Sequence, residues 1–143
     1  MAHILVMEDE EEFGQLISAS LERAGHVVTL RHNATSAESA FKKNEIDLVI
    51  ADIIVRQNGQ SVPDGGLTLI TKIRRTMQHS NPKLPIIAIS GVTHYPGMHS
   101  VLSIAASLGA SAALRKPFAP SKLLEMIDDL LENGREGLEE GQT

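Results

Sequence analysis

The 143-residue chain contains no cysteine and no tryptophan, and it has only one tyrosine and three phenylalanines. Without cysteine there can be no disulfide framework, no thiolate nucleophile and no Cys-ligated zinc or iron–sulfur centre. Few aromatic rings are available to stack on nucleic-acid bases or on a flavin. No apolar run approaches the roughly 18 residues of a membrane span, and acidic residues interrupt the N-terminus where a signal peptide needs an apolar stretch. We therefore expect a cytoplasmic protein without membrane insertion.

Acidic residues outnumber basic ones, with 18 Asp and Glu against 13 Lys and Arg and a formal net charge of −5. Nucleic-acid backbones attract basic surfaces, so this balance predicts no direct DNA binding. The length fits one domain with a single core. We expect that domain to span residues 1–132, and we expect the acidic, glycine-rich residues 133–143 to be a disordered tail.

Short aliphatic runs alternate with segments whose apolar residues repeat at helical spacing, which is the pattern of successive strand–helix units. The predicted strands are His3–Met7, His26–Leu30, Asp47–Ala51, Pro85–Ser90 and Ser111–Arg115. Right-handed crossovers between them would give an open parallel sheet with helices on both faces, an α/β fold. The segment Arg56–Gly66 carries Gly, Pro and Asn signals and is predicted to be a loop.

Polar side chains stand at the carboxyl ends of four predicted strands. These side chains are Glu8, Asp9, Asp52, Ser90 and Lys116. Such strand ends meet at one edge of a parallel sheet, where ligand sites lie. Three carboxylates close together repel one another unless a cation joins them, and all-oxygen ligation suits Mg²⁺. A carboxylate beside a metal, a hydroxyl and an ammonium is equipped to attack phosphorus, which would make an aspartyl phosphate.

Four motifs in register with these strands, MEDE, VIADI, IAISG and LRKPF, resemble the signature of response-regulator receiver domains of bacterial two-component signalling. The resemblance implies a flavodoxin-like, doubly wound, five-stranded parallel sheet with strand order 2-1-3-4-5. By the same resemblance Asp52 is the phosphoacceptor. Ser90 resembles the switch hydroxyl, and Lys116 the lysine that pairs with the phosphoryl oxygens.

The resemblance also implies Mg²⁺ as the cofactor. Its ligands would be Glu8, Asp9, Asp52 and the main-chain carbonyl of Ile54. The phosphoryl donor would be a histidine kinase or a histidine phosphotransfer protein, and output would pass to a downstream protein partner. We expect a stand-alone response regulator, which is not an enzyme beyond assisting its own phosphoryl transfer and slow self-hydrolysis. The sequence does not specify an oligomeric state.

Two features depart from the family pattern. Ala113 occupies the position, three residues before the lysine, where receivers usually carry an aromatic residue. The segment between Asp52 and Asp64 is longer than the family's by about five residues, a length that is more often functional than neutral. These departures motivate an alternative, a receiver-like protein-binding scaffold that acts without phosphorylation. A third hypothesis is a magnesium-dependent aspartyl-phosphate phosphatase. Such an enzyme usually carries an acid two residues after its nucleophile, and Ile54 occupies that position here.

Overall fold

The computed structural model describes residues 1–53, 55–57, 60–62, 65–76, 84–91 and 101–140. Five strands form one parallel sheet in the order β2-β1-β3-β6-β7. Because β6 and β7 are the fourth and fifth strands of this sheet along the chain, this confirms the predicted order 2-1-3-4-5. These strands are β1 (His3–Met7), β2 (Val27–Arg31), β3 (Leu48–Asp52), β6 (Ile86–Ser90) and β7 (Ala112–Arg115). The helices are α1 (Glu11–Arg23), α2 (Ala34–Lys43), α3 (Gly65–Thr76), α4 (Val101–Leu108) and α5 (Pro120–Glu140).

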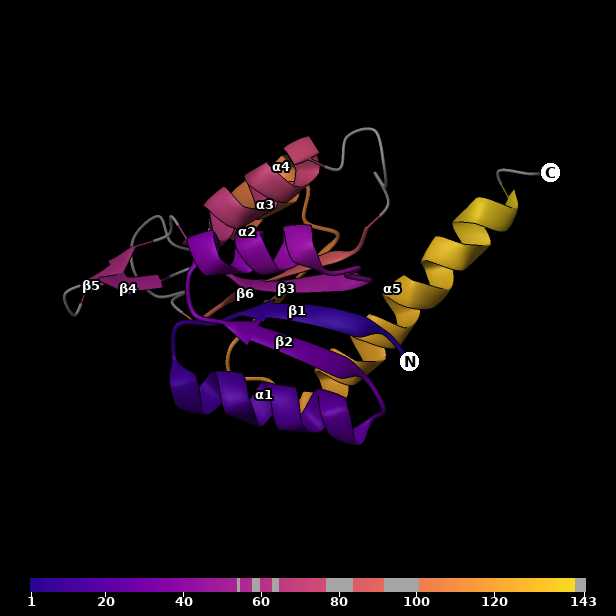
Figure 1. The fold of residues 1–143 in the computed structure, drawn as a ribbon, viewed down its shortest axis with the longest axis horizontal. Helices are drawn as coiled ribbons and strands as arrows, with labels where there is room; N and C mark the ends of the chain where they lie inside the picture. Colours follow the sequence, from indigo (N-terminus) through magenta and orange to yellow (C-terminus); the bar gives the residue numbers. More distant parts are fainter. Residues whose placement is uncertain (54, 58–59, 63–64, 77–83, 92–100, 141–143) are drawn as a thin grey trace.

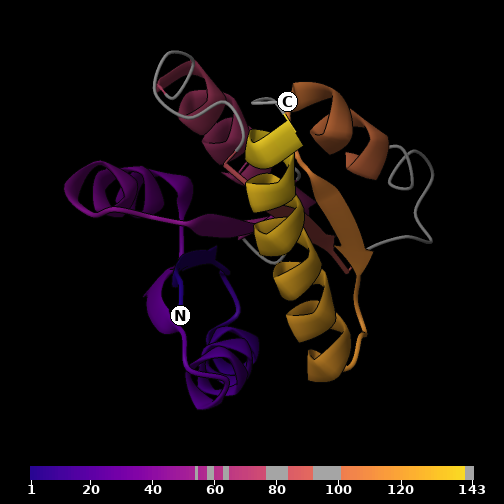
Figure 2. The ribbon, with the colours of Figure 1, turned by 90° about the vertical axis from the view of Figure 1, so that its right-hand side faces the viewer.

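Helices cover both faces of the sheet (Figure 1). Helices α1 and α5 pack on one face, and α2, α3 and α4 pack on the other. In Figure 2, α1 and α2 lie on opposite sides of the strands, and α5 runs in front of the strands. The central strands β1, β3 and β6 therefore lie between two helical layers.

Alternation along the buried strands explains why both faces are covered. In β1, Leu5 and Met7 belong to the core under α2, α3 and α4, whereas Ile4 and Val6 belong to the core under α1 and α5. Successive side chains of a strand point to opposite faces, so a continuous aliphatic run needs apolar cover on each side. This layering leaves the carboxyl edge of the sheet as the place where polar groups can gather.

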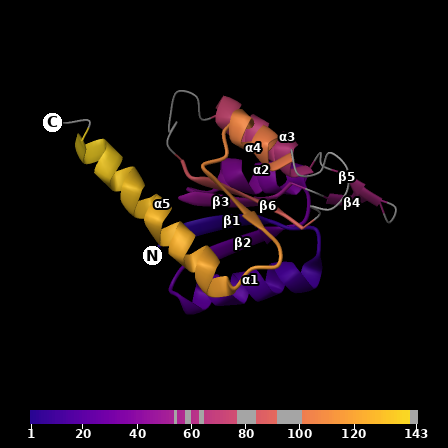
Figure 3. The ribbon, with the colours of Figure 1, turned by 180° about the vertical axis from the view of Figure 1, so that it is seen from behind.

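The segment predicted to be a loop contains a β-hairpin. Strands β4 (Val55–Gln57) and β5 (Gln60–Val62) pair antiparallel, and α3 begins at Gly65. The sequence between the two strands is Asn-Gly, the dipeptide most favoured for a two-residue hairpin connection, so the signal for this hairpin was present. The hairpin follows β3 directly and stands out from the main sheet (Figures 1 and 3).

Helix α5 continues to Glu140 in the structure and so runs into residues 133–143, whose disorder stays a prediction. Gly134 and Gly137 each cost only about 1 kcal/mol relative to alanine in a helix, and the neighbouring Glu, Leu and Arg residues favour helix. These two glycines therefore do not end α5, whose last turns extend beyond the sheet (Figures 1 and 3). In the part of the chain that the structure describes, no helix is long and apolar enough to cross a membrane.

Candidate functional site

The polar residues singled out in the sequence gather at the carboxyl edge of the sheet, around the end of β3. Asp52 is the last residue of β3 and is 2% exposed, and Glu8, which follows β1, is 1% exposed. Ser90 ends β6 and is fully buried. Asp52 thus lies inside the protein, and residues at the ends of the neighbouring strands β1 and β6 supply polar groups around it.

Three carboxylates meet at this point. Ligand oxygens of Glu8, Asp9 and Asp52 all lie within 4.8 Å of one another. The ammonium of Lys116 reaches the same cluster from the end of β7. Its Nζ lies 2.8 Å from Glu8 Oε1 and 3.6 Å from Asp52 Oδ2. The amide of Lys116 donates to the carbonyl oxygen of Ser90 at 2.8 Å, which ties the ends of β6 and β7 together beside the acids.

Main-chain contacts fix the position of Glu8. Its amide donates to the carbonyl oxygen of Arg31 at 2.9 Å, and its carbonyl oxygen lies 2.9 Å from Nδ1 of His32. Because a carbonyl only accepts, Nδ1 of His32 carries the proton in this contact. The amide of Glu10 also donates to Glu8 Oε2 at 3.1 Å. The end of β2 therefore holds the acidic turn that follows β1.

Burial raises the pKa of Asp52 to about 9. The negative charge of Glu8 and hydrogen bonding to Glu8 raise this pKa further, whereas the charge of Lys116 lowers it. A hydrogen bond with Asp9 has a smaller raising effect. The cluster therefore carries more negative charge than one ammonium can neutralise, and it favours either a proton or another cation.

The donor set fits Mg²⁺. The three acids offer only oxygen atoms, which Mg²⁺ prefers, and a site with few protein ligands leaves positions for water and phosphate oxygens. Glu8 and Asp52 are buried, whereas Asp9 is partly exposed. Asp9 therefore marks the side from which the cluster can be reached. Ile54, whose carbonyl was predicted to be a further ligand, lies outside the described residues.

The hydroxyl of Ser90 is buried and has no hydrogen-bond partner among the described residues. Leaving a buried polar group unpaired costs about 1–3 kcal/mol, so native structures rarely tolerate it without a reason. Ser90 ends the strand that pairs with β3, and Asp52 pairs in register with the residue before it, Ile89. Ser90 and Asp52 therefore lie at the ends of neighbouring strands, at the same edge of the sheet.

Sequence reasoning missed two residues that shape the site. A side chain at Gly66, in the first turn of α3, would bring its Cβ to 2.4 Å from the carbonyl oxygen of Asp52 and 2.6 Å from Cα of Ile53. Helix α3 therefore packs directly against the backbone of Asp52 and Ile53. The ring of Phe13 lies below Lys116 Nζ, which is 4.2 Å from the ring centroid. For Gly66, the only signal in the sequence was the Asp-Gly-Gly run that contains it, and that run indicated a turn.

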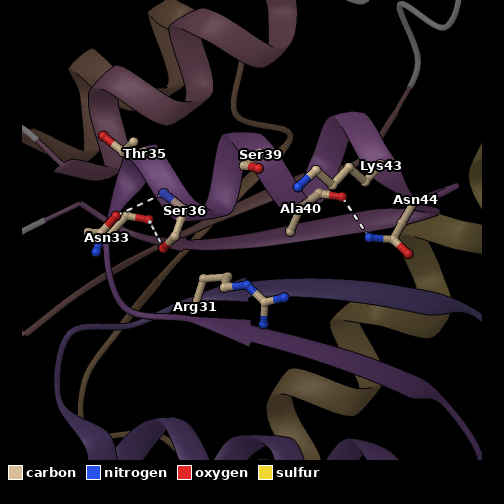
Figure 4. A pocket seen from close by; sticks show the side chains of 8 residues that line it. All are labelled: Arg31, Asn33, Thr35, Ser36, Ser39, Ala40, Lys43 and Asn44. Atoms are coloured by element: carbon tan, nitrogen blue, oxygen red, sulfur yellow. Dashed lines mark hydrogen bonds between the residues drawn. The ribbon is translucent and has the colours of Figure 1, made fainter.

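A separate groove of about 400 Å³ lies between α2 and the edge strand β2 (Figure 4). Its lining residues are Arg31, Asn33, Thr35, Ser36, Ser39, Ala40, Lys43 and Asn44. Three hydrogen bonds inside this lining belong to α2 and its ends. The Ser36 amide donates to Asn33 Oδ1 at 2.8 Å, the Ser36 hydroxyl donates to the Asn33 carbonyl at 3.4 Å, and Asn44 Nδ2 donates to the Ala40 carbonyl at 2.8 Å. None of the described residues that line the groove carries a carboxylate, so the acidic cluster lies elsewhere.

The chain matches the response regulator receiver domain family over residues 4–128. It is 31% identical to the uncharacterized transcriptional regulatory protein YkoG of Bacillus subtilis (strain 168) over 125 residues, which are 87% of this chain and 49% of that protein. It is 29% identical to the transcriptional regulatory protein CusR of Escherichia coli (strain K12) over 140 residues, 97% of this chain and 55% of CusR. The chain thus spans about half the length of these curated relatives.

These relatives correct the prediction of no direct DNA binding, because they are named as transcriptional regulators. The prediction rested on the net charge of this chain, and that charge describes only the residues of this chain. This chain covers about half of each relative, so the acidity of one domain says nothing about surfaces in the rest of such proteins.

Solved structures resemble the chain over most of its length. The receiver domain of NtrX from Brucella abortus is 31% identical, with a TM-score of 0.74, and the alignment covers 90% of this chain and 98% of that one. A CheY-like receiver domain protein from Methanospirillum hungatei JF-1 is 20% identical, with a TM-score of 0.78, and the alignment covers 96% of this chain and 98% of that one. The second likeness shows the fold alone. With the match over residues 4–128, these findings show that the chain belongs to the response regulator receiver domain family.

Proposed function

We propose that this domain accepts a phosphoryl group on Asp52 in a magnesium-dependent reaction. The donor is a histidine kinase or a histidine phosphotransfer protein, and the signal passes on through contact with a downstream protein. The observation that carries the proposal is a buried carboxylate at a strand end, with two further acids within 4.8 Å and an ammonium at 3.6 Å. Membership of the receiver family supports the same reaction class.

In the proposed transfer, a carboxylate oxygen of Asp52 attacks the phosphorus of the donor. A phosphorus–oxygen bond forms, and the bond from phosphorus to the donor imidazole nitrogen breaks, with its electron pair leaving on the imidazole. The protonated carboxyl is a poor nucleophile, so the raised pKa of Asp52 must be lowered before attack. Bound Mg²⁺ supplies the positive charge that favours the carboxylate and neutralises charge on the phosphoryl group.

Two other side chains have roles in this proposal. Lys116, whose ammonium already lies 3.6 Å from Asp52 Oδ2, pairs with a phosphoryl oxygen. Ser90 donates to another phosphoryl oxygen and so gains the hydrogen bond that its buried hydroxyl lacks among the described residues. The gain of this bond would make phosphorylation favour a new position of Ser90, which gives the domain a way to report its state. We also propose slow self-hydrolysis of the aspartyl phosphate.

Acetyl phosphate tests the acceptor with a small donor that needs no partner protein. The wild-type chain with Mg²⁺ should gain one phosphoryl group by intact-mass spectrometry, and EDTA should prevent the gain. Asp52→Asn should gain none, because it lacks the nucleophile. Asp128→Asn, which changes an exposed aspartate of α5, is the matched control and should label as the wild type does. Labelling of Asp52→Asn would contradict the assignment.

One alternative rests on Ala113, which is exposed on β7 where receivers usually carry an aromatic residue. A receiver-like scaffold that binds a protein without phosphorylation would not label under any of these conditions. The acetyl phosphate experiment therefore separates the two functions. Action as a stand-alone regulator and a cytoplasmic location stay predictions.

A further inference from the structure

The ammonium of Lys116 is held against an aromatic ring as well as against acids. Its Nζ lies over the ring of Phe13, 4.2 Å from the centroid, which is well inside the distance of a cation–π contact. Phe118, two residues after Lys116, packs edge-on against the same ring, with centroids 5.6 Å apart and planes at 84°. This T-shaped pair fixes the orientation of Phe13, whose face is then available to the ammonium.

The stem of Lys116 is confined too. A Cβ at Gly91 would lie 3.1 Å from Cδ of Lys116, so the aliphatic chain runs close across the backbone that follows β6. The side chain of Lys116 is 18% exposed. Its ammonium therefore has Phe13 on one side and the carboxylates of Glu8 and Asp52 on another, with little freedom to leave.

We propose that Phe13 is a positioning residue that keeps the ammonium of Lys116 beside Asp52 during phosphoryl transfer. The inference rests on the proposed function. The ammonium of Lys116 lies 2.8 Å from Glu8 and 3.6 Å from Asp52, but Glu8 is also one of the acids that fit Mg²⁺. A cation that shares the charge of Glu8 weakens its attraction for Lys116. The ring of Phe13 does not bind Mg²⁺, so its contact with Lys116 is not subject to this competition.

Phe13→Leu removes the ring and keeps an apolar side chain, and Phe13→Tyr keeps a ring face. Phe41→Leu is the matched control, because Phe41 is buried in α2, in the core on the other face of the sheet. The first readout is the proton shift of the Lys116 ε-methylene, with and without Mg²⁺. It should lie upfield from the ring current in wild type, Phe13→Tyr and Phe41→Leu, and it should return to an ordinary value in Phe13→Leu.

The second readout is the rate of labelling by acetyl phosphate at saturating Mg²⁺. Phe13→Leu should be slower by about twofold to fivefold, the factor that a partly buried cation–π contact is worth. Phe13→Tyr and Phe41→Leu should stay near the wild-type rate. Should Phe13→Leu fail to fold by circular dichroism, Phe13→Met replaces it as the variant without a ring.

The outcomes separate this inference from the function on which it rests. A wild-type chain that never labels refutes the proposed function, and the inference falls with it. A wild-type chain that labels, with Phe13→Leu equally fast or slowed no more than Phe41→Leu, refutes the positioning role alone. An ordinary shift for the Lys116 methylene in the Mg²⁺-bound wild type would also refute it.

Discussion

Replacing Asp52 with asparagine should stabilise the metal-free protein, and the stabilisation should grow as the pH rises. Burial, reinforced by the charge of Glu8, raises the pKa of Asp52 from its ordinary value of 3.8 to about 9. The folded state therefore holds this proton more tightly than the unfolded chain does. The stability that the protonated carboxyl contributes is fully present below pH 3.8 and is lost as the pH rises toward 9. Asparagine does not ionise, so the variant avoids this loss.

The size of the effect follows from proton linkage. Between about pH 5 and pH 8 the unfolded chain has released the proton of Asp52 while the folded chain keeps it. Each pH unit in this window lowers the free energy of unfolding by up to about 1.4 kcal/mol. Three units set an upper limit of about 4 kcal/mol, and relaxation of the folded site reduces it. We expect the advantage of Asp52→Asn over wild type to increase by about 1–4 kcal/mol across the window.

Urea unfolding followed by circular dichroism measures this difference. Wild type and Asp52→Asn are unfolded in EDTA at three pH values, and the wild-type free energy is subtracted from that of the variant. The subtraction removes the titration of the 6 histidines, which both proteins contain. Added Mg²⁺ should stabilise the wild type more than the variant, because the metal needs the carboxylate. A free-energy difference that is the same at pH 5 and pH 8 would refute the reasoning.

Glu8→Gln with Asp9→Asn should abolish Mg²⁺ binding in calorimetric titration, because it removes two of the three clustered acids; unchanged affinity would refute the metal site. Ser90→Ala should still label with acetyl phosphate and should be neutral or up to about 1 kcal/mol more stable at rest, because the Ser90 hydroxyl has no partner within the described part of the chain. Its amide shifts should respond less to beryllofluoride than those of wild type, and an equal response would place the switch elsewhere. Gly66→Ala should lower the free energy of unfolding by about 2 kcal/mol or more and slow labelling, because its Cβ would meet the backbone of Asp52. Wild-type stability in that variant would contradict the close packing of α3.

Much of the fold could be predicted because its signals are local. Aliphatic runs such as those around Leu5 and Val49 need apolar cover on both faces, which a parallel sheet between helices supplies, and the predicted strand order is observed. The same logic placed Glu8, Asp9 and Asp52 at one edge, where the structure brings them together. Their roles in phosphoryl transfer stay predictions.

The remaining features depend on contacts between residues distant in the sequence. The contact of Phe13 with Lys116 joins α1 to the end of β7, and neither local sequence predicts this contact. The need for glycine at Gly66 likewise comes from the approach of α3 to the end of β3. The β4–β5 hairpin is different, because Asn58-Gly59 was a local signal that the surrounding polar residues obscured.

Borohydride trapping tests the central claim most directly. The wild-type chain is incubated with acetyl phosphate and Mg²⁺ and then reduced, which converts an aspartyl phosphate into homoserine at the modified position. Peptide mass spectrometry should find homoserine in place of Asp52 and at no other aspartate, and only when Mg²⁺ is present. Homoserine at a different aspartate, or none in a chain that remains folded and binds Mg²⁺, would contradict the assignment of Asp52 as the phosphoacceptor.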